Sequence, residues 1–191
     1  MKLKILKFQS SGYTILELLV VVAIISILSF IFITDFTKAK LQFALSRTVH
    51  KFEQDTRKMQ SLALKSQSFV DSQGAVHPIK GYGVHVVAST KQYYLYADNS
   101  PGNASYDNQD YLVDTIDFSL TEPGIIIQEI KFPSQSAPFA SINFSPPNPI
   151  TTITSSFGSL DNVVDIVFAF EGDPSQTKTI SINTTGLIEI K

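Results

Sequence analysis

Three residues near the start of the chain, Gly12, Tyr13 and Glu17, have types and spacings that could carry chemistry. Glycine has no Cβ atom, so the peptide bond that follows Gly12 is sterically unhindered. Glu17 is the one charged residue in an otherwise apolar run, residues 13–34. A carboxylate within a bilayer costs about 3 kcal/mol on insertion scales, so an acid in such a run is predicted to have a function.

The apolar run is long enough to place these residues at a membrane. As an α-helix its 22 residues would be about 33 Å long, enough to cross the hydrocarbon core of a bilayer. Three lysines precede the run, Lys2, Lys4 and Lys7, with no acid among them. The positive-inside rule keeps these lysines on the cytoplasmic side, so we expect a single-pass membrane protein with its C-terminal part outside.

Two simpler interpretations of this segment compete. A secretory signal peptide needs small residues at a cleavage site after its apolar core. Here the run is followed by Asp35-Phe36-Thr37-Lys38, which lacks them. An uncleaved anchor accounts for the apolar run but gives no reason for Glu17.

The string from Gly12 to Val22, GYTILELLVVV, resembles the class III signal of type IV pilins and type II secretion pseudopilins. The resemblance implies that a prepilin peptidase cuts between Gly12 and Tyr13 and methylates the new amine of Tyr13. Glu17 would then be the assembly contact, meeting the Tyr13 amine of a neighbouring subunit so that each buried charge has a partner. The implied partners are the peptidase, other pilins or pseudopilins in a helical filament, an inner-membrane assembly platform, and the lipid bilayer before assembly.

The sequence predicts four segments: a cleaved basic leader (1–12), a transmembrane and assembly helix (13–34), an amphipathic continuation of that helix (35–68), and a globular head (69–191). In the continuation, apolar residues at spacings of three, four or seven form one stripe, which predicts a helix face that packs on the head. The stripe comprises Leu41, Leu45, Val49, Phe52, Met59 and Ala63. Charged residues, Asp55 among them, are predicted to lie on the other faces.

The head is predicted to be β-rich, because short β-branched runs alternate with Ser, Gly, Asn and Pro. At the end of the chain, Ile180 and Ile182 should face Ile188 and Ile190 in a hairpin whose turn, residues 183–186, uses Gly186. The fold class is therefore α+β, a long N-terminal helix packed on an antiparallel β-rich head, as in pilins. The predicted strands are 82–88, 92–97, 111–118, 125–132, 139–144, 163–170, 178–183 and 187–190.

A second stretch, residues 52–66 (FEQDTRKMQSLALKS), resembles the helix end of H-type minor pseudopilins and FimT-like minor pilins. The closing hairpin is similar to theirs as well. This resemblance implies a minor subunit.

Other functions have little support in the sequence. No P-loop, dinucleotide fingerprint or G-x-S-x-G motif is present, and His50, His77 and His85 do not lie at metal-ligand spacing, so we expect no enzyme, no catalytic residue and no cofactor. Residues 69–191 carry 5 basic and 13 acidic side chains, so no nucleic-acid binding is expected.

The segment from Asp98 to Asp110 is a candidate calcium loop, since it is rich in the carboxylate and amide oxygens that calcium prefers. The alternative is a solvated acidic loop.

Taken together, the sequence predicts a structural subunit, a minor pilin or pseudopilin, of a type IV pilus, competence or type II secretion filament. It would leave the bacterial cytoplasmic membrane for a periplasmic or cell-surface filament. The alternatives are a major pilus subunit, a single-pass anchored surface binding protein, and, with the least support, a DNA-uptake receptor.

Overall fold

The computed structural model describes residues 12–99, 103–146, 150–158 and 162–191, and leaves out the side chains of residues 31–38. The predicted leader, residues 1–12, lies outside this description except for Gly12. By its contacts the chain divides into two compact units, residues 1–40 and 41–191. Both units contain part of one helix, α1 (Ile15–Leu64).

Helix α1 ends at Leu64, four residues before the predicted end. Ser66 adopts the left-handed backbone conformation with a φ of 48°. The backbone N–H of Ser66 donates to the Ala63 carbonyl at 2.9 Å, and that of Gln67 donates to the Leu62 carbonyl at 3.4 Å. This is the Schellman arrangement that satisfies the last carbonyls of a helix, and it normally uses glycine where this chain has serine.

The first part of α1 is apolar on all sides. The large apolar side chains of residues 15–30 are exposed by 46% to 87%. Among the described residues, no helix is both long enough and apolar enough to cross a membrane. The transmembrane span predicted for residues 13–34 is therefore not shown.

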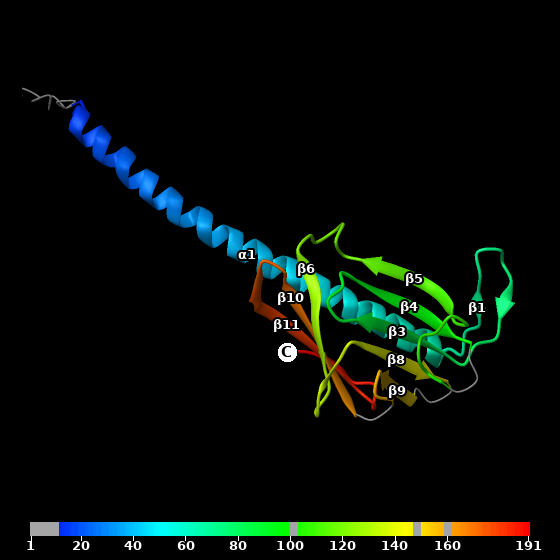
Figure 1. Ribbon diagram of the computed structural model, residues 1–191. Helices are drawn as coiled ribbons and strands as arrows, with labels where there is room; N and C mark the ends of the chain where they lie inside the picture. Colours follow the sequence, from blue (N-terminus) through cyan, green and yellow to red (C-terminus); the bar gives the residue numbers. More distant parts are fainter. Residues whose placement is uncertain (1–11, 100–102, 147–149, 159–161) are drawn as a thin grey trace, which may run out of the picture. The chain divides into compact units, whose positions relative to one another are not determined.

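The head contains two five-stranded antiparallel sheets and a small hairpin (Figure 1). The first sheet has the strand order β5-β4-β3-β8-β9, and the second has the order β12-β11-β10-β6-β7. The strands are β1 (Phe69–Val70), β2 (Val76–His77), β3 (Gly81–Val87), β4 (Gln92–Asp98), β5 (Tyr111–Asp117), β6 (Ile125–Lys131), β7 (Ser136–Ala137), β8 (Phe139–Ser145), β9 (Ile150–Ser155), β10 (Val163–Phe170), β11 (Asp173–Asn183) and β12 (Ile188–Ile190).

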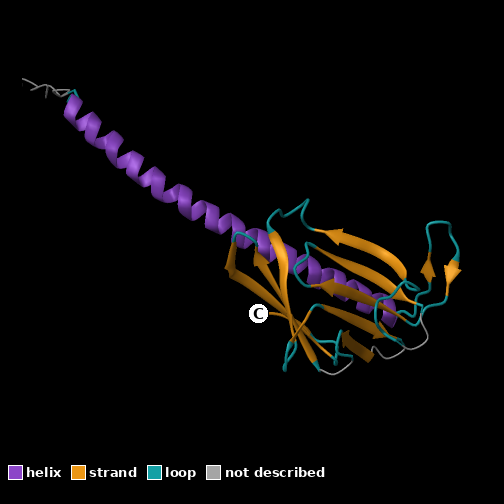
Figure 2. Ribbon diagram, viewed as in Figure 1, coloured by secondary structure: helices purple, strands orange, loops and turns teal. Residues whose placement is uncertain are grey.

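The second part of α1 packs one face against strands of both sheets and leaves its other face exposed (Figure 2). The predicted stripe is buried from Leu45 to Ala63. The fully buried ring of Phe52 lies 4.9 Å from the ring of Tyr93 in β4 and 5.5 Å from that of Phe168 in β10. Burying a side chain of this size contributes about 2–3 kcal/mol. The α+β class is confirmed, with the helix packed on antiparallel strands.

One prediction for α1 is wrong: Asp55 does not lie on a solvent-facing side. It is 6% exposed and accepts a hydrogen bond from the Tyr93 hydroxyl at 2.7 Å. Lys51, one turn earlier, donates to its other oxygen at 2.7 Å. Asp55 follows Phe52 by three residues and precedes Met59 by four, which places it on the packed face.

Candidate functional site

The start of α1 is defined by Thr14, which is its N-cap residue. The Thr14 carbonyl accepts a bond from the N–H of Leu18 at 3.1 Å, the first hydrogen bond of the helix. Its side-chain Oγ1 accepts from the N–H of Glu17 at 3.2 Å. An N-cap satisfies backbone donors that no carbonyl within the helix can reach. Glu17 is therefore the third helical residue, where a carboxylate also interacts favourably with the helix dipole.

The two residues of the predicted cleavage bond, Gly12 and Tyr13, precede this cap and are not helical. The side chain of Tyr13 is 81% exposed. A Cβ atom added to Gly12 would meet no atom within 4 Å. The fold therefore gives no steric reason for a glycine at this position.

Glu17 lies in the first turn of α1, next to exposed apolar side chains. Among the described residues, its carboxylate has no hydrogen-bond or ion-pair partner. Within the described residues, the site thus combines an accessible peptide bond, a carboxylate without a partner one turn further on, and an exposed apolar helix surface.

The last third of α1 is hydrogen-bonded to both sheets. Arg57 donates from Nη2 to the Ile188 carbonyl in β12 at 3.1 Å, and Gln60 donates from Nε2 to the Gly186 carbonyl at 3.1 Å. Asp55 makes the corresponding contact with the first sheet through Tyr93. These polar residues position the helix within the head.

The described residues of the candidate calcium loop are partly packed against the head and partly exposed. Asp98 is 2% exposed and accepts from Nδ2 of Asn143 at 2.6 Å. Asp110 accepts from the N–H groups of Asn99 at 3.0 Å and of Asp107 at 2.8 Å. In the part of the chain that the structure describes, no three His, Asp or Glu side chains are grouped to hold a metal. Calcium binding stays a prediction.

Residues 103–110, which we call the outer loop, lie on the first sheet. The ring of Tyr106 stacks on that of Tyr94 in β4, with centroids 5.7 Å apart. The N–H of Tyr106 donates at 3.2 Å to the hydroxyl of Ser141, a buried residue of β8. The same hydroxyl lies 2.8 Å from Nδ1 of His85. Burial lowers the pKa of His85 to about 4, so the imidazole is neutral at pH 7.

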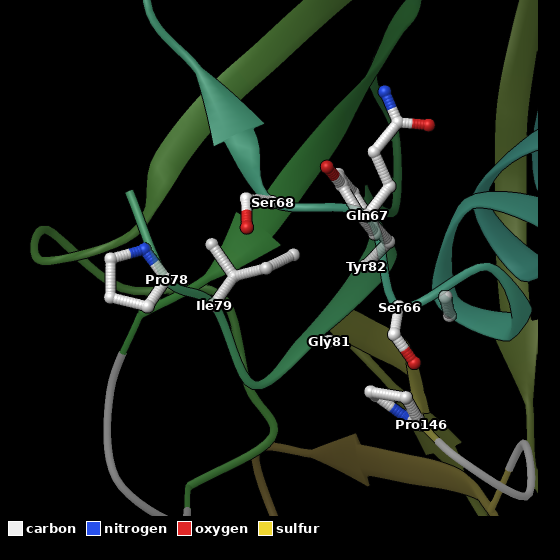
Figure 3. Close-up of a pocket in the computed structure, with 9 residues that line it drawn as sticks. Ser66, Gln67, Ser68, Pro78, Ile79, Gly81, Tyr82 and Pro146 are labelled. Atoms are coloured by element: carbon white, nitrogen blue, oxygen red, sulfur yellow. The ribbon is translucent and has the colours of Figure 1, made fainter. Parts of the chain in front are cut away.

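A pocket of about 130 Å³ lies where α1 ends, between the segment after the helix and the segment before β3 (Figure 3). The described residues that line it include no carboxylate, imidazole or amine, and burial raises the pKa of the Tyr82 phenol among them. This lining offers no acid–base pair. The expectation that the chain is not an enzyme stays a prediction. The lining residues are Ala63, Ser66, Gln67, Ser68, Pro78, Ile79, Gly81, Tyr82 and Pro146.

No role was predicted for Thr14, although the sequence contains a signal for a helix that starts at this residue. Thr14-Ile15-Leu16-Glu17 fits the pattern of a Ser or Thr followed three residues later by Glu, which is typical of a helix start. The pairing of His85 with Ser141 had no such signal, because the two residues are 56 positions apart.

Comparison with known proteins identifies one sequence family. Residues 7–33 match the family described as the prokaryotic N-terminal methylation motif. No curated protein and no solved structure matches the chain. The match supports a type IV pilin-like class, in which a prepilin peptidase processes the precursor and the product assembles with other pilins.

Proposed function

We propose that this chain is the precursor of a minor pilin or pseudopilin, cut between Gly12 and Tyr13 and assembled through its N-terminal helix. The observation that carries the proposal is the carboxylate of Glu17, which has no partner among the described residues and lies on an exposed apolar helix, within the segment that matches the methylation motif. A minor role is supported by the resemblance of residues 52–66 to minor subunits. We propose no catalytic role, no cofactor and no nucleic-acid partner.

Processing would be two reactions at one bond. Water adds across the Gly12–Tyr13 amide, which leaves a carboxylate on Gly12 and a free amine on Tyr13. A methyl group then passes from a sulfonium donor to that amine, with loss of one proton and release of a thioether. The non-helical backbone and exposed side chain of Tyr13 are consistent with access by an enzyme.

Assembly would bring opposite charges together in an apolar environment. The methylated amine of Tyr13 remains a cation at neutral pH, and Glu17 supplies the anion. A buried charge without a partner costs several kcal/mol, so pairing between subunits favours the filament over isolated helices. The apolar residues of 15–30 would face lipid before assembly and other subunits afterwards, with the head outside the cytoplasmic membrane.

Intact-mass measurement of the membrane-bound protein, with and without a co-expressed prepilin peptidase, tests processing. We expect a product that starts at Tyr13 and is heavier by one methyl group. The variant Gly12→Ala should stay uncut, and since a Cβ there meets no atom within 4 Å, its fold should be unchanged. A chain that keeps its first twelve residues beside an active peptidase would refute the proposal.

The variant Glu17→Gln separates processing from assembly. It should still be cut between Gly12 and Tyr13, but it should sediment with filaments far less than the parent. The replacement keeps the size of the side chain and removes the charge, so equal incorporation of both proteins would show that the charge pair has no role.

A further inference from the structure

We propose that Thr14 is a positioning residue for the processing step: as N-cap, it starts the helix late enough to keep the Gly12–Tyr13 bond out of it. This inference rests on the proposed function, because it concerns the same bond. Thr14 would set where the helix begins, which neither the carboxylate of Glu17 nor the missing side chain of Gly12 can do.

The cap geometry carries the inference. Both acceptors of Thr14 are engaged by the first turn, its carbonyl by Leu18 and its Oγ1 by Glu17, at 3.1 and 3.2 Å. A residue whose side chain caps a helix has a non-helical backbone, so the helix cannot include the residues before it. Regular helix accordingly begins at Ile15, and residues 12–14 have no assigned secondary structure.

Without a cap, little in the sequence would stop the helix from growing toward the N-terminus. Tyr13 is compatible with a helix, and the nearest residue that disfavours one is Gly12. One further turn would let the Leu16 N–H bond to the Gly12 carbonyl, which is the carbonyl of the bond to be cut. A peptide group fixed in a helix is poorly cut, since proteolysis concentrates where the backbone is exposed and free of such bonds.

The size of the effect follows from the strength of an N-cap. Replacing a threonine cap by a residue without an acceptor shifts the equilibrium between capped and uncapped starts by about five-fold, which corresponds to about 1 kcal/mol. If cleavage requires the non-helical bond, the initial rate of processing falls with the fraction of capped chains, so about five-fold is the largest decrease that this shift can cause.

The test uses the full-length precursor in detergent micelles with purified prepilin peptidase, and measures initial cleavage rates by mass spectrometry. Thr14→Val keeps the shape of the side chain and removes the acceptor, so it should be cut more slowly, by up to about five-fold. Thr14→Ser and Thr14→Asn keep an acceptor and should be cut at nearly the parent rate. Backbone carbon chemical shifts of residues 12–16, measured by NMR in the same micelles, report where the helix begins.

The outcomes separate this inference from the proposed function. If the parent is not cut, the proposed function fails. If the parent is cut and Thr14→Val is cut equally fast, the inference is overturned while the proposed function stands. If every replacement slows cleavage alike, or if Thr14→Val slows it without extending the helix, the peptidase reads the threonine side chain directly and the capping role is refuted.

Discussion

Acidification should weaken the head through His85, the imidazole held under the outer loop. The ring lies between the rings of Tyr106 and Phe139, at centroid distances of 5.0 and 5.6 Å, and burial is the cause of its low pKa. The ordinary pKa is 6.5 and the folded-state pKa is about 4, so the unfolded chain binds a proton first as the pH falls. The contribution of the neutral His85 to the free energy of unfolding is therefore fully present above pH 6.5 and is lost as the pH falls toward 4.

The magnitude follows from the gap between the two pKa values of His85. Each pH unit between them costs about 1.4 kcal/mol, so about 3 kcal/mol should be lost between pH 6.5 and pH 4. For a chain of this length that loss corresponds to a fall in Tm of roughly 6–12 °C. Carboxyl groups with lowered pKa values, such as those of Glu53 and Asp71, make stability depend on pH only at the acid end of this window.

Thermal unfolding of the full chain in a nonionic detergent, followed by near-ultraviolet circular dichroism at several pH values, measures the fall. In His85→Gln, which has no proton to gain, the slope between pH 6.5 and 4.5 should flatten. An NMR titration of the imidazole gives the pKa of His85 directly. A value near 6.5, or an unchanged slope in His85→Gln, would refute the reasoning.

Two further predictions concern the contacts that fix α1 in the head. Tyr93→Phe removes the donor at 2.7 Å from the buried carboxylate of Asp55 and should lower the free energy of unfolding by about 2 kcal/mol, measured by thermal unfolding; an unchanged Tm would show that this bond is dispensable. Gly186→Ala should lower the free energy of unfolding more than Gly74→Ala does. Both glycines have a φ near +84°. A Cβ atom at position 186 would lie 2.7 Å from Nε2 of Gln60, whereas one at position 74 meets no atom within 4 Å. Backbone strain should lower the free energy of unfolding of each variant by about 1 kcal/mol. An equal decrease in both variants would mean that the contact with Gln60 has no effect.

The regular parts of the head could be predicted because they depend on local patterns. Alternating apolar residues identified β10 with its bounds. The closing hairpin brings the expected isoleucines together, in the register Ile180 with Ile190 and Ile182 with Ile188. Gly186 has the positive φ, 83°, that its turn requires. In each case one short window of sequence contains both the strand signal and the turn signal.

The missed features depend on partners far away in the sequence or on weak local signals. The burial of Asp55 depends on a hydrogen bond from Tyr93, which is 38 residues later. Strand β9 is rich in threonine and was not predicted, and β1, β2 and β7 have two residues each. At the start of α1, the spacing identified Gly12 and Glu17 but not the cap between them.

The position of Phe52 between the two sheets has a mechanical consequence. The packed face of the second part of α1 joins the two sheets, since the Phe52 ring contacts both β4 and β10. Tension applied along the helix would load both sheets together, through Asp55 on one and through Arg57 and Gln60 on the other. We therefore expect the two sheets to unfold together under force, in a single step.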